Sequence, residues 1–514
     1  MPRPRGRKGD SLLDSEGEFP KPPAQPPGVR RAPARIVSAP TRRRVRRHRG
    51  RPRASSGAAE RRGSAPTRTR LLAVRVLERV QRAGAYADLL LHSTLARSSL
   101  NAPDRAFATE LVYGTLRWRG RIDYMLGRCL DGDLDKLEPL VATALRVGAY
   151  QILFATGVPA TAAVDEAVRC VRACGGERAT GLVNAVLRRL AVEHERIALP
   201  ALADDPLGHL VHTLSLPMWI AARWIEHYGA EEAAALARAC NDAPPLTVRV
   251  NPHQGTREEL LEELRERFPE ARACRYARHG LVLGRRGNAA IDPAFLAGRF
   301  TVQDEASQLV VGLLDPQLGE RVLDVCAAPG GKAGAIAERV GKNGMVLALD
   351  RNARRLDMVR RAARRLQLGR LECAVRDAAL GLVSVGDEGG FDRVLVDAPC
   401  SGLGALRRNP DARWRVRPSD PARLADTQLA ILRNAAEALR PEGVLVYSTC
   451  TLLPEENEGV IESFLRRSGQ FELTSQVEAP AEVRELVGSD GFLRCLPQHH
   501  DTDGFFAARL EKRA

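Results

Sequence analysis

Two cysteines stand where a thiolate could act as a nucleophile. Cys400 lies in Asp397-Ala-Pro-Cys400-Ser-Gly and Cys450 in Ser448-Thr-Cys450-Thr, and each motif directly follows a run of apolar, strand-forming residues. Thiolates are strong nucleophiles that form covalent intermediates. A lone cysteine is more often a buried structural residue, but two at equivalent strand ends favour chemistry. Spacing alone leaves both interpretations open.

The elements that would position these cysteines alternate along residues 303–514. Short apolar strands separated by helices are typical of a parallel, doubly wound sheet, in which ligands bind at the carboxyl ends of the strands. Both cysteines should therefore open onto one ligand-binding edge. The predicted strands are 321–325, 345–350, 394–397 and 443–447, and the predicted helices include 352–366 and 424–439.

The first strand-to-helix turn of this sheet carries a glycine pair. Its residues are Asp324, Val325, Cys326, Ala327, Ala328, Pro329, Gly330, Gly331 and Lys332. Adjacent glycines let the backbone approach a ligand closely. Asp350 ends the next strand, where a carboxylate can accept hydrogen bonds from ribose hydroxyls. Asp377 follows a third short strand and could reach an adenine amino group, although an acid in such a loop is more often simply solvated.

The pattern around these glycines matches neither the P-loop nor Gly-x-Gly-x-x-Gly. A nucleoside cofactor without a phosphate-binding loop indicates S-adenosylmethionine, and position alone leaves NAD open. A methyl donor beside two cysteines would suit methylation of cytosine at C5. That carbon is a poor nucleophile until a thiolate adds to C6, after which a base removes the C5 proton and the thiolate leaves.

No metal site is expected from the cysteine spacing. Cys400 lacks the second cysteine of a Pro-Cys-x-x-Cys site, and no His-x-Glu occurs in the sequence, which argues against a zinc deaminase. Cys170 and Cys174 share one helical face but have no nearby Cys/His pair to complete a zinc site. We interpret that pair as core packing.

The residues before the sheet predict two further domains. Residues 67–205 carry one-sided apolar stripes and few strand signals, which predicts an all-α domain. Within it, residues 110–118 predict a helix with an aromatic anchor. Residues 206–302 predict a small α/β linking subdomain with strands near 246–251, 280–283 and 300–302. A helix should begin after Thr256, which forms a capping box with Glu259.

The net charge of +15 belongs to the N-terminal segment. Residues 1–70 hold 20 Lys and Arg against 5 Asp and Glu, which leaves 58 basic and 58 acidic residues in the rest. Residues 1–66 are rich in Pro, Arg, Gly and Ser and predict a disordered tail. The tail is either a solubilising extension or an arm that adds phosphate contacts. The folded part must bind any polyanion through local patches.

The catalytic motifs resemble the signature blocks of RNA 5-methylcytosine methyltransferases. The matching blocks are Cys326-Ala-Ala-Pro-Gly-Gly-Lys332, Asp397-Ala-Pro-Cys400-Ser-Gly-Leu-Gly and Ser448-Thr-Cys450-Thr, extended by Asn409-Pro-Asp411 and Pro454-Glu-Glu-Asn-Glu458. In the helical domain, Tyr113-Gly-Thr-Leu-Arg-Trp118 resembles the NusB-like RNA-binding module. With the ending Asp503-Gly-Phe-Phe506, this order is similar to the bacterial RsmB/Sun branch, over roughly residues 67–514.

The resemblance implies a role for each matching residue. Cys450 would be the nucleophile, and Cys400 would assist release of the methylated base. Residues 326–332 with Asp350, Asp377 and Asp397 would contact S-adenosylmethionine. Asp397 would also border the target cytosine, and Lys332 would help to position it. The basic tail departs from the family pattern, and the resemblance does not explain it.

The resemblance also implies a substrate and a cellular location for the enzyme. Its substrate would be 16S ribosomal RNA, before subunit assembly is complete, and the chain would act as a cytoplasmic monomer without a metal or a membrane. The sequence has no signal peptide pattern and no apolar run of about 18 residues. Two alternatives stay open: a methyltransferase for transfer RNA or another ribosomal cytosine, and a non-catalytic NusB-like RNA-binding factor. The intact cysteines and glycine turn argue against the second.

Overall fold

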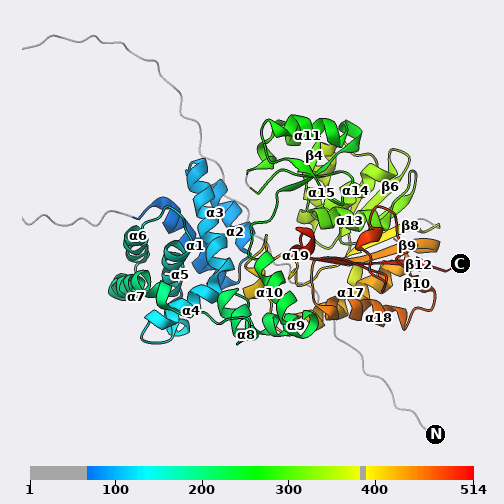
Figure 1. Cartoon of the computed structure of the whole chain (residues 1–514). Helices are drawn as coiled ribbons and strands as arrows, with labels where there is room; N and C mark the ends of the chain where they lie inside the picture. Colours follow the sequence, from blue (N-terminus) through cyan, green and yellow to red (C-terminus); the bar gives the residue numbers. More distant parts are fainter. Residues whose placement is uncertain (1–65, 286, 383–388, 514) are drawn as a thin grey trace, which may run out of the picture. The chain divides into compact units, whose positions relative to one another are not determined.

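Seven α-helices form the first folded part of the chain (Figure 1). The computed structural model describes residues 66–285, 287–382 and 389–513, so the predicted tail lies outside the described residues except for its last position. The described residues belong to one contact unit, Gly63–Ala514. The seven helices are α1 (Arg68–Ala83), α2 (Ala87–Ala96), α3 (Ala102–Arg117), α4 (Arg119–Cys129), α5 (Pro139–Leu153), α6 (Ala160–Ala173) and α7 (Thr180–Glu193).

Helix α5 lies at the centre of this bundle. Every residue from Val141 to Gln151 is buried, and α5 packs against α1, α3, α4, α6 and α7. A helix that is buried on all sides needs apolar or small residues all round. The prediction of an all-α domain is confirmed. The helix predicted over residues 110–118 is also confirmed as the end of α3, where Trp118 stacks on Phe154 with ring centroids 4.9 Å apart.

Three helices and a small antiparallel sheet follow. The helices are α8 (Pro206–Gly208), α9 (Met218–Tyr228) and α10 (Ala230–Ala239), and the strands are β1 (Thr247–Val250), β2 (Arg272–Ala273), β3 (Gly280–Val282) and β4 (Phe300–Val302), in the order β2-β3-β1-β4. Helix α11 (Arg257–Arg265) begins with the predicted capping box between Thr256 and Glu259, which is confirmed. Helix α12 (Pro293–Leu296) precedes β4.

The last part of the chain forms an eight-stranded sheet between two helical layers. Its order is β10-β12-β9-β8-β5-β6-β7, with β11 paired to β12. The strands are β5 (Arg321–Asp324), β6 (Met345–Asp350), β7 (Leu371–Val375), β8 (Phe391–Asp397), β9 (Leu439–Thr449), β10 (Phe471–Leu473), β11 (Phe492–Cys495) and β12 (Phe505–Lys512). Strands β5–β9 pair in parallel, whereas β10, β11 and β12 pair antiparallel. This confirms the doubly wound, mostly parallel fold predicted from the sequence.

Neighbouring residues of each strand face opposite helical layers. In β5, Val322 packs with one cluster and Leu323 with the other, as alternation along a strand requires. Helices α13 (Glu305–Leu314), α14 (Gly331–Val340) and α15 (Ala353–Leu366) supply the first layer, and α17 (Asp420–Glu437) and α18 (Glu458–Leu465) the second. The remaining helices are the short α16 (Ala412–Arg415) and α19 (Pro497–His500).

A buried ion pair joins the small sheet to the large one. Arg249 of β1 contacts Glu338 of α14 at 2.8 Å, and both side chains are 4% exposed. Arg249 also donates to the carbonyl of Gly331, at the start of α14. Because both charges have left water, each depends on the other for compensation.

Replacing Arg249 by Met should lower the free energy of unfolding by about 3–5 kcal/mol, because Glu338 then stays buried without its partner. Urea or thermal unfolding measures the loss. Arg360→Met is the control, since Arg360 pairs with Asp357 at the surface and should cost less than about 1 kcal/mol. Equal losses in the two variants would contradict this account of the Arg249 pair.

Candidate active site

The residues singled out in the sequence lie at consecutive strand ends of the large sheet. Strands β5, β6 and β8 end at Asp324, Asp350 and Asp397, and β9 ends one residue before Cys450. Asp377 follows β7, the edge strand beside β6. Because these five strands are parallel, their carboxyl ends meet at one edge of the sheet.

The two cysteines lie next to each other at this edge. Strands β8 and β9 are parallel neighbours with Asp397 paired to Ser448, and the backbone amide of Ala398 donates to the Ser448 carbonyl at 2.8 Å. The following loops bring the Sγ atoms of Cys400 and Cys450 to 3.4 Å. Both cysteines are partly exposed. The expectation that both loops open onto one edge is therefore met in the geometry.

The two thiols form one hydrogen-bonded pair, in which either sulfur could be the donor. The hydrogen bond to Cys450, followed by burial, raises the pKa of the Cys400 thiol well above its usual value. This shift favours the protonated form of Cys400, which can donate a hydrogen bond to the second sulfur.

A buried glutamate ties the two cysteine loops together. Glu456 is fully buried, and its carboxylate accepts hydrogen bonds from the Ser401 amide at 2.8 Å, the Ser401 hydroxyl and the Gln428 amide at 3.0 Å. Burial raises the pKa of Glu456, whereas the bonds from Ser401 and Gln428 lower it. The Ser401 hydroxyl also contacts the Thr451 hydroxyl at 2.8 Å. The neighbours of both cysteines are thereby fixed to one another.

Asn457 holds the other side of the Cys450 loop. Its side-chain oxygen accepts from the Thr449 hydroxyl at 2.6 Å, and its amide donates to the Thr451 carbonyl at 3.1 Å. The residues on both sides of Cys450 are therefore anchored to one side chain. Sequence reasoning gave no positioning role to Glu456 or Asn457. The block Pro454-Glu-Glu-Asn-Glu458, which extends the family motif, was the signal that could have been followed.

The glycine turn is shaped by close contact with the neighbouring helix. Gly330 has φ of 110°, and a Cβ built on it would lie 3.1 Å from the Cα of Val359 in α15. Both facts restrict this position to glycine. The Arg355 guanidinium, also from α15, donates to the Ala328 carbonyl. The turn of residues 326–332 is thus held open beside the ends of β5 and β6.

Charged side chains converge behind this turn. Lys332 is 8% exposed and its ammonium lies 2.8 Å from the Asp397 carboxylate and 4.9 Å from the centre of the Phe505 ring. Asp397 also accepts from the Ser448 hydroxyl at 3.1 Å. Asp350 accepts from the Asn352 amide at 2.8 Å. Lys332 and Asp397 therefore come together as predicted, between the glycine turn and the Cys400 loop.

Asp324 is a buried acid at the centre of this cluster. Burial, followed by the charge of Asp397, raises the pKa of Asp324 to about 7, and Lys332 opposes the shift. Its two carboxylate oxygens have no hydrogen-bond partner among the described residues. Three carboxylates therefore lie at neighbouring strand ends, where Lys332 pairs with Asp397 and Arg355 lies 3.6 Å from Asp350. The remaining carboxylate, of Asp324, fits the sulfonium and ammonium groups of S-adenosylmethionine.

Asp377 lies at the margin of the site. It is partly exposed and its carboxylate accepts from the Ala379 amide at 3.1 Å, which caps a short 3-10 turn. The register pairs Asp350 with Val375, two residues before Asp377. Asp377 is therefore near the end of β6 but is not part of the Lys332 cluster.

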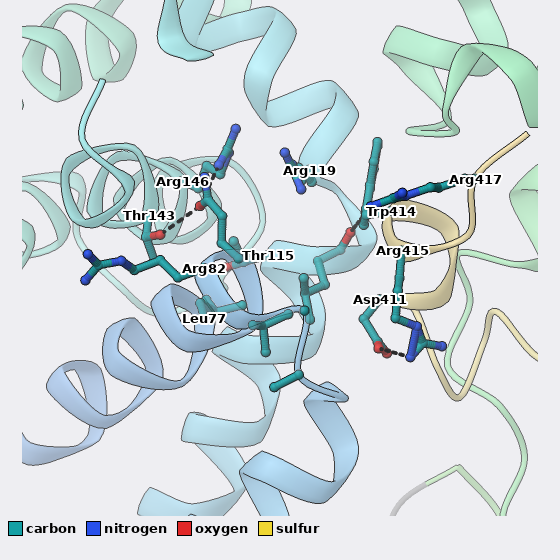
Figure 2. A pocket seen from close by; sticks show the side chains of 15 residues that line it. Leu77, Arg82, Thr115, Arg119, Thr143, Arg146, Asp411, Trp414, Arg415 and Arg417 are labelled. Carbon is teal, nitrogen blue, oxygen red and sulfur yellow. Dashed lines mark hydrogen bonds and ion pairs between the residues drawn. The ribbon is translucent and has the colours of Figure 1, made fainter. Parts of the chain in front are cut away.

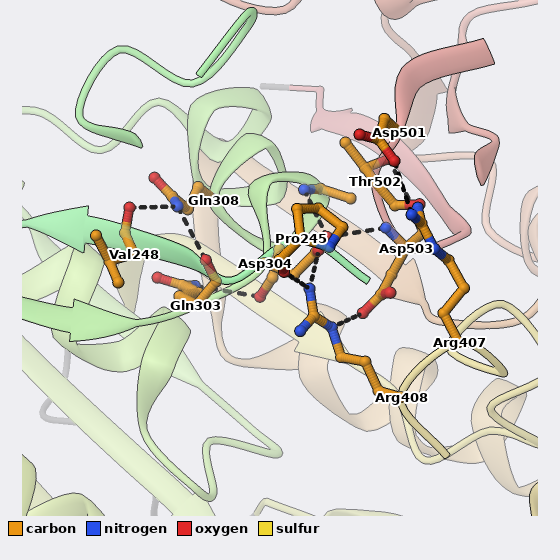
Figure 3. A network of polar contacts seen from close by, with 12 residues as sticks. Pro245, Val248, Gln303, Asp304, Gln308, Arg407, Arg408, Asp501, Thr502 and Asp503 are labelled. Atoms are coloured by element: carbon orange, nitrogen blue, oxygen red, sulfur yellow. Dashed lines mark hydrogen bonds and ion pairs between the residues drawn. The ribbon is translucent and has the colours of Figure 1, made fainter. Parts of the chain in front are cut away.

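The C-terminal segment contacts Arg407 and Arg408, in the segment that follows Cys400 (Figure 3). Arg408 forms ion pairs of 2.7 Å with both Asp304 and Asp503, and the Asp503 amide donates to Asp304 at 3.1 Å. Burial, followed by the charge of Asp304, raises the pKa of Asp503 to about 7, and Arg408 lowers it. Sequence reasoning noted Asp503 only as part of a family ending, because partners 95 and 199 residues away leave no local signal.

Backbone hydrogen bonds connect the C-terminal segment to Cys450. The Gly504 amide donates to the Gly404 carbonyl, and the Gly404 amide donates to the Cys450 carbonyl, each at 2.9 Å. A Cβ on Gly404 would lie 2.1 Å from the Gly504 carbonyl oxygen. The close approach of these three backbone segments requires glycine at position 404.

Asp324→Asn should reduce the pH dependence of stability. Because the folded-state pKa of Asp324, about 7, lies above its ordinary value of 3.8, its stabilising contribution is full below about pH 4 and is lost as the pH rises through 7. The free energy of unfolding should fall between about pH 5 and pH 8 by more in the wild type than in Asp324→Asn.

Urea unfolding at the two pH values measures this difference. Asp357→Asn, at an exposed position of α15, is the control and should keep the wild-type dependence. A decrease of the same size in Asp324→Asn and in the wild type would show that the buried carboxyl does not titrate in this range.

Among the described residues, no helix is long and apolar enough to cross a membrane. The same residues contain no group of three or more His, Cys, Asp or Glu side chains arranged to hold a metal ion.

Comparison with known proteins assigns the chain to a family. Residues 311–511 match the family described as 16S rRNA methyltransferase RsmB/F, residues 67–192 match the NusB family, and residues 216–290 match the ferredoxin-like domain of RsmF/B-like methyltransferases. A Bacillus subtilis protein named probable ribosomal RNA small subunit methyltransferase B is 37% identical over 87% of this chain and 99% of its own length. The Pseudomonas putida ribosomal RNA small subunit methyltransferase B is 36% identical over 87% of this chain and 98% of its own.

Solved structures agree with this assignment. The crystal structure of the protein PH0851 is 26% identical, covers 86% of this chain and 99% of its own, and superposes with a TM-score of 0.71. A methyltransferase homologue from Pyrococcus horikoshii is 29% identical over 60% of this chain and 99% of its own, with a TM-score of 0.51. With the cysteine pair, the glycine turn and the preceding helical domain in the order described above, the chain belongs to the RsmB/F family of S-adenosylmethionine-dependent RNA methyltransferases.

Proposed function

We propose that this enzyme transfers a methyl group from S-adenosylmethionine to C5 of a cytosine in 16S ribosomal RNA, through a covalent bond between Cys450 and C6. The observation that carries the proposal is the 3.4 Å approach of Cys400 and Cys450 at neighbouring strand ends. A cysteine pair at the ligand-binding edge suits a reaction that must form and then break a bond to carbon. The names of the relatives support ribosomal RNA as substrate.

The cofactor would lie along the turn of residues 326–332. Its cationic groups would be bound by Asp324 and Asp397, its ribose by Asp350, and its adenine beside Asp377. The unpartnered oxygens of Asp324 support this arrangement. When bound, S-adenosylmethionine supplies an electrophilic methyl carbon.

Cys450 would carry out the covalent step. Its thiolate adds to C6 of the cytosine, and electron density shifts to C5, which can then attack a methyl carbon. Asp397, held by Lys332 and Ser448, would face the base and orient it. After methylation a base takes the C5 proton, the electrons of that C–H bond restore the C5–C6 double bond, and the Cys450 sulfur leaves as a thiolate.

Cys400 would assist the last step. Because its pKa is raised, it holds a proton that can form a hydrogen bond to the departing Cys450 sulfur. That bond stabilises the leaving thiolate as negative charge develops on it. The same bond stabilises the Cys450 thiolate before attack, so the two cysteines act as one unit with different roles.

The target base would need to be unstacked, because C6 can be attacked only from a face of the ring. We propose that the chain acts as a monomer in the cytoplasm, on 16S RNA that is not yet enclosed in a complete subunit. A base packed inside a complete subunit is shielded from the enzyme, whereas RNA outside a complete subunit is accessible, which supports this timing. The tail would at most add phosphate contacts.

We also propose the division of the chain into a tail (1–66), a NusB-like domain (67–205), a linking subdomain (206–302) and a methyltransferase domain (303–514). The end of α7 at Glu193, the strands β1–β4 within 247–302 and the helix α13 starting at Glu305 support these limits. The family matches to residues 67–192, 216–290 and 311–511 fall inside them.

Cys450→Ala should abolish methyl transfer and leave S-adenosylmethionine binding unchanged, because the thiolate touches only the base. In cells lacking the gene, bisulfite sequencing of total RNA should show one unprotected cytosine in 16S RNA. The wild-type gene and the control Cys174→Ala should restore protection, and Cys450→Ala should not. Restoration by Cys450→Ala would refute the nucleophile assignment, and a lost site in transfer RNA would refute the substrate.

Replacing Cys400 by Ala or Ser should trap enzyme on RNA. The bond to C6 still forms, but the departing sulfur loses its thiol partner, so the adduct should accumulate as a slowly migrating band on a denaturing gel. The double variant Cys400→Ser/Cys450→Ala is the control and should show no band. Free enzyme alone in the Cys400→Ser lane, with Cys450 intact, would be incompatible with a role in release.

A further inference from the structure

A pocket of about 500 Å³ lies where the helical domain meets the segment after Cys400 (Figure 2). Helices α1, α3 and α5 form one side, and α16 with the residue stretch 411–417 forms the other. We call it the seam pocket. Its volume is within the range of about 300–1,000 Å³ typical of ligand pockets. It is far along the chain from the cofactor turn and has no part in the mechanism above.

The seam pocket is strongly basic. Its arginines outnumber its acids, since Asp411 is its one lining carboxylate and already contacts Arg415 at 3.5 Å. Burial raises the pKa of Asp411, and the charge of Arg415 opposes the shift. The lining arginines are Arg82, Arg119, Arg146, Arg415 and Arg417.

Two of these arginines converge on Asp123. Arg146 is 4% exposed, binds Asp123 at 2.7 Å and 3.0 Å and lies 4.0 Å from Asp135. Arg119 reaches the same Asp123 at only 3.4 Å. Burial, followed by the charge of Arg146, lowers the pKa of Arg119. An anion at this wall of the pocket would relieve the repulsion between the two guanidinium groups.

The same wall offers a stacking surface and an unsatisfied hydroxyl. The indole nitrogen of Trp414 donates to the Leu116 carbonyl at 2.6 Å, which fixes the ring, and the Arg119 guanidinium lies 5.2 Å from it. Thr115 is 3% exposed, lines the pocket, and its hydroxyl has no hydrogen-bond partner among the described residues. A buried hydroxyl without a partner is unfavourable, so a ligand that hydrogen-bonds to it would be stabilised.

Arginines, an aromatic ring and an unpaired hydroxyl together suit an unpaired nucleotide. Single-stranded RNA is bound by arginine contacts to phosphate and by stacking of bases on aromatic rings or guanidinium planes. A simple anion would use the charge but neither the ring nor the hydroxyl.

The walls of the pocket are rigidly connected to the catalytic loop. Arg413, fully buried, donates to the carbonyls of Arg117, Ser215 and Cys240 and to the side chain of Asn241. Arg117 in turn donates to the Arg407 carbonyl at 2.7 Å. The segment from Cys400 to Arg417 therefore stays docked on the helical domain, which fixes the spacing between the pocket and the cysteines.

We propose that the seam pocket binds one unpaired nucleotide of the substrate RNA, with its phosphate on Arg82, Arg119 and Arg417 and its base against Trp414. This nucleotide lies outside the target cytosine and sets its distance from Cys450. The inference rests on the proposed function for the identity of the RNA, but the recognition of single-stranded RNA by the pocket is independent of it.

Charge reversal at the rim tests the pocket. Arg82→Glu/Arg417→Glu should raise the KM for transcribed 16S RNA at least tenfold and make binding less dependent on salt, because phosphate contacts are lost. The kcat at saturating RNA and the binding of S-adenosylmethionine should not change. Arg466→Glu is the matched control, because Arg82 and Arg466 are equally exposed (66% and 67%) and each pairs with a glutamate four residues earlier.

Stacking on Trp414 is tested with defined RNA. Single-stranded hexauridylate should quench tryptophan emission saturably, and a duplex RNA of similar length should not. Trp414→Leu should remove the quenching, whereas Trp219→Leu should keep it. Thermal unfolding of each variant separates loss of the pocket from loss of the fold.

The results separate this inference from the proposed function. The pocket assignment would be overturned if Arg82→Glu/Arg417→Glu had the same KM as Arg466→Glu and the quenching survived Trp414→Leu. Protection of Trp414 by a protein partner but not by RNA would also overturn it. If wild-type enzyme leaves every 16S cytosine unmethylated, the proposed function fails, and the hexauridylate experiment still decides whether the pocket binds single-stranded RNA.

Discussion

The parallel pairing of β8 and β9 is the constraint on which the site depends. Parallel neighbours deliver their following loops to the same edge of a sheet, so the pairing of Asp397 with Ser448 carries the two cysteines to one place. The Sγ–Sγ distance of 3.4 Å is then set by the two loops. At this distance one thiol can donate a hydrogen bond to the other, and the pKa of Cys400 is raised. The proposed division of roles between Cys450 and Cys400 rests on this approach.

Buried polar groups maintain this geometry. Glu456 joins the two loops through Ser401 and Gln428, and Arg408 fastens the C-terminal segment to them through Asp304 and Asp503. Buried charges contribute little net stability, but they are costly to leave unpaired and therefore specify one arrangement. The cysteine loops are held by such contacts, whereas apolar packing of α17 and α18 holds the strands beneath them.

The seam pocket bears on how the substrate is selected. The enzyme must select one cytosine among many with identical reacting atoms, so selection has to come from contacts away from the base. A nucleotide site on the helical domain, docked to the segment after Cys400 by Arg413 and Trp414, supplies such a contact. The helical domain would then set the distance between the seam pocket and the cysteine pair, because buried hydrogen bonds fix that distance.

The sequence alone determined the fold class, the glycine turn and the two cysteine motifs, because each depends on short-range patterns: apolar periodicity, strand-end loops and glycine pairs. The small strands β10, β11 and β12 escaped prediction because they are defined by pairing with β9 and with one another. Only the tertiary structure decided that the two sulfurs lie 3.4 Å apart, that Glu456 and Arg408 hold the loops, and that arginines of the helical domain and of the segment after Cys400 line one pocket. These features depend on burial and on contacts between residues far apart in sequence, and such contacts leave no periodic trace in the chain.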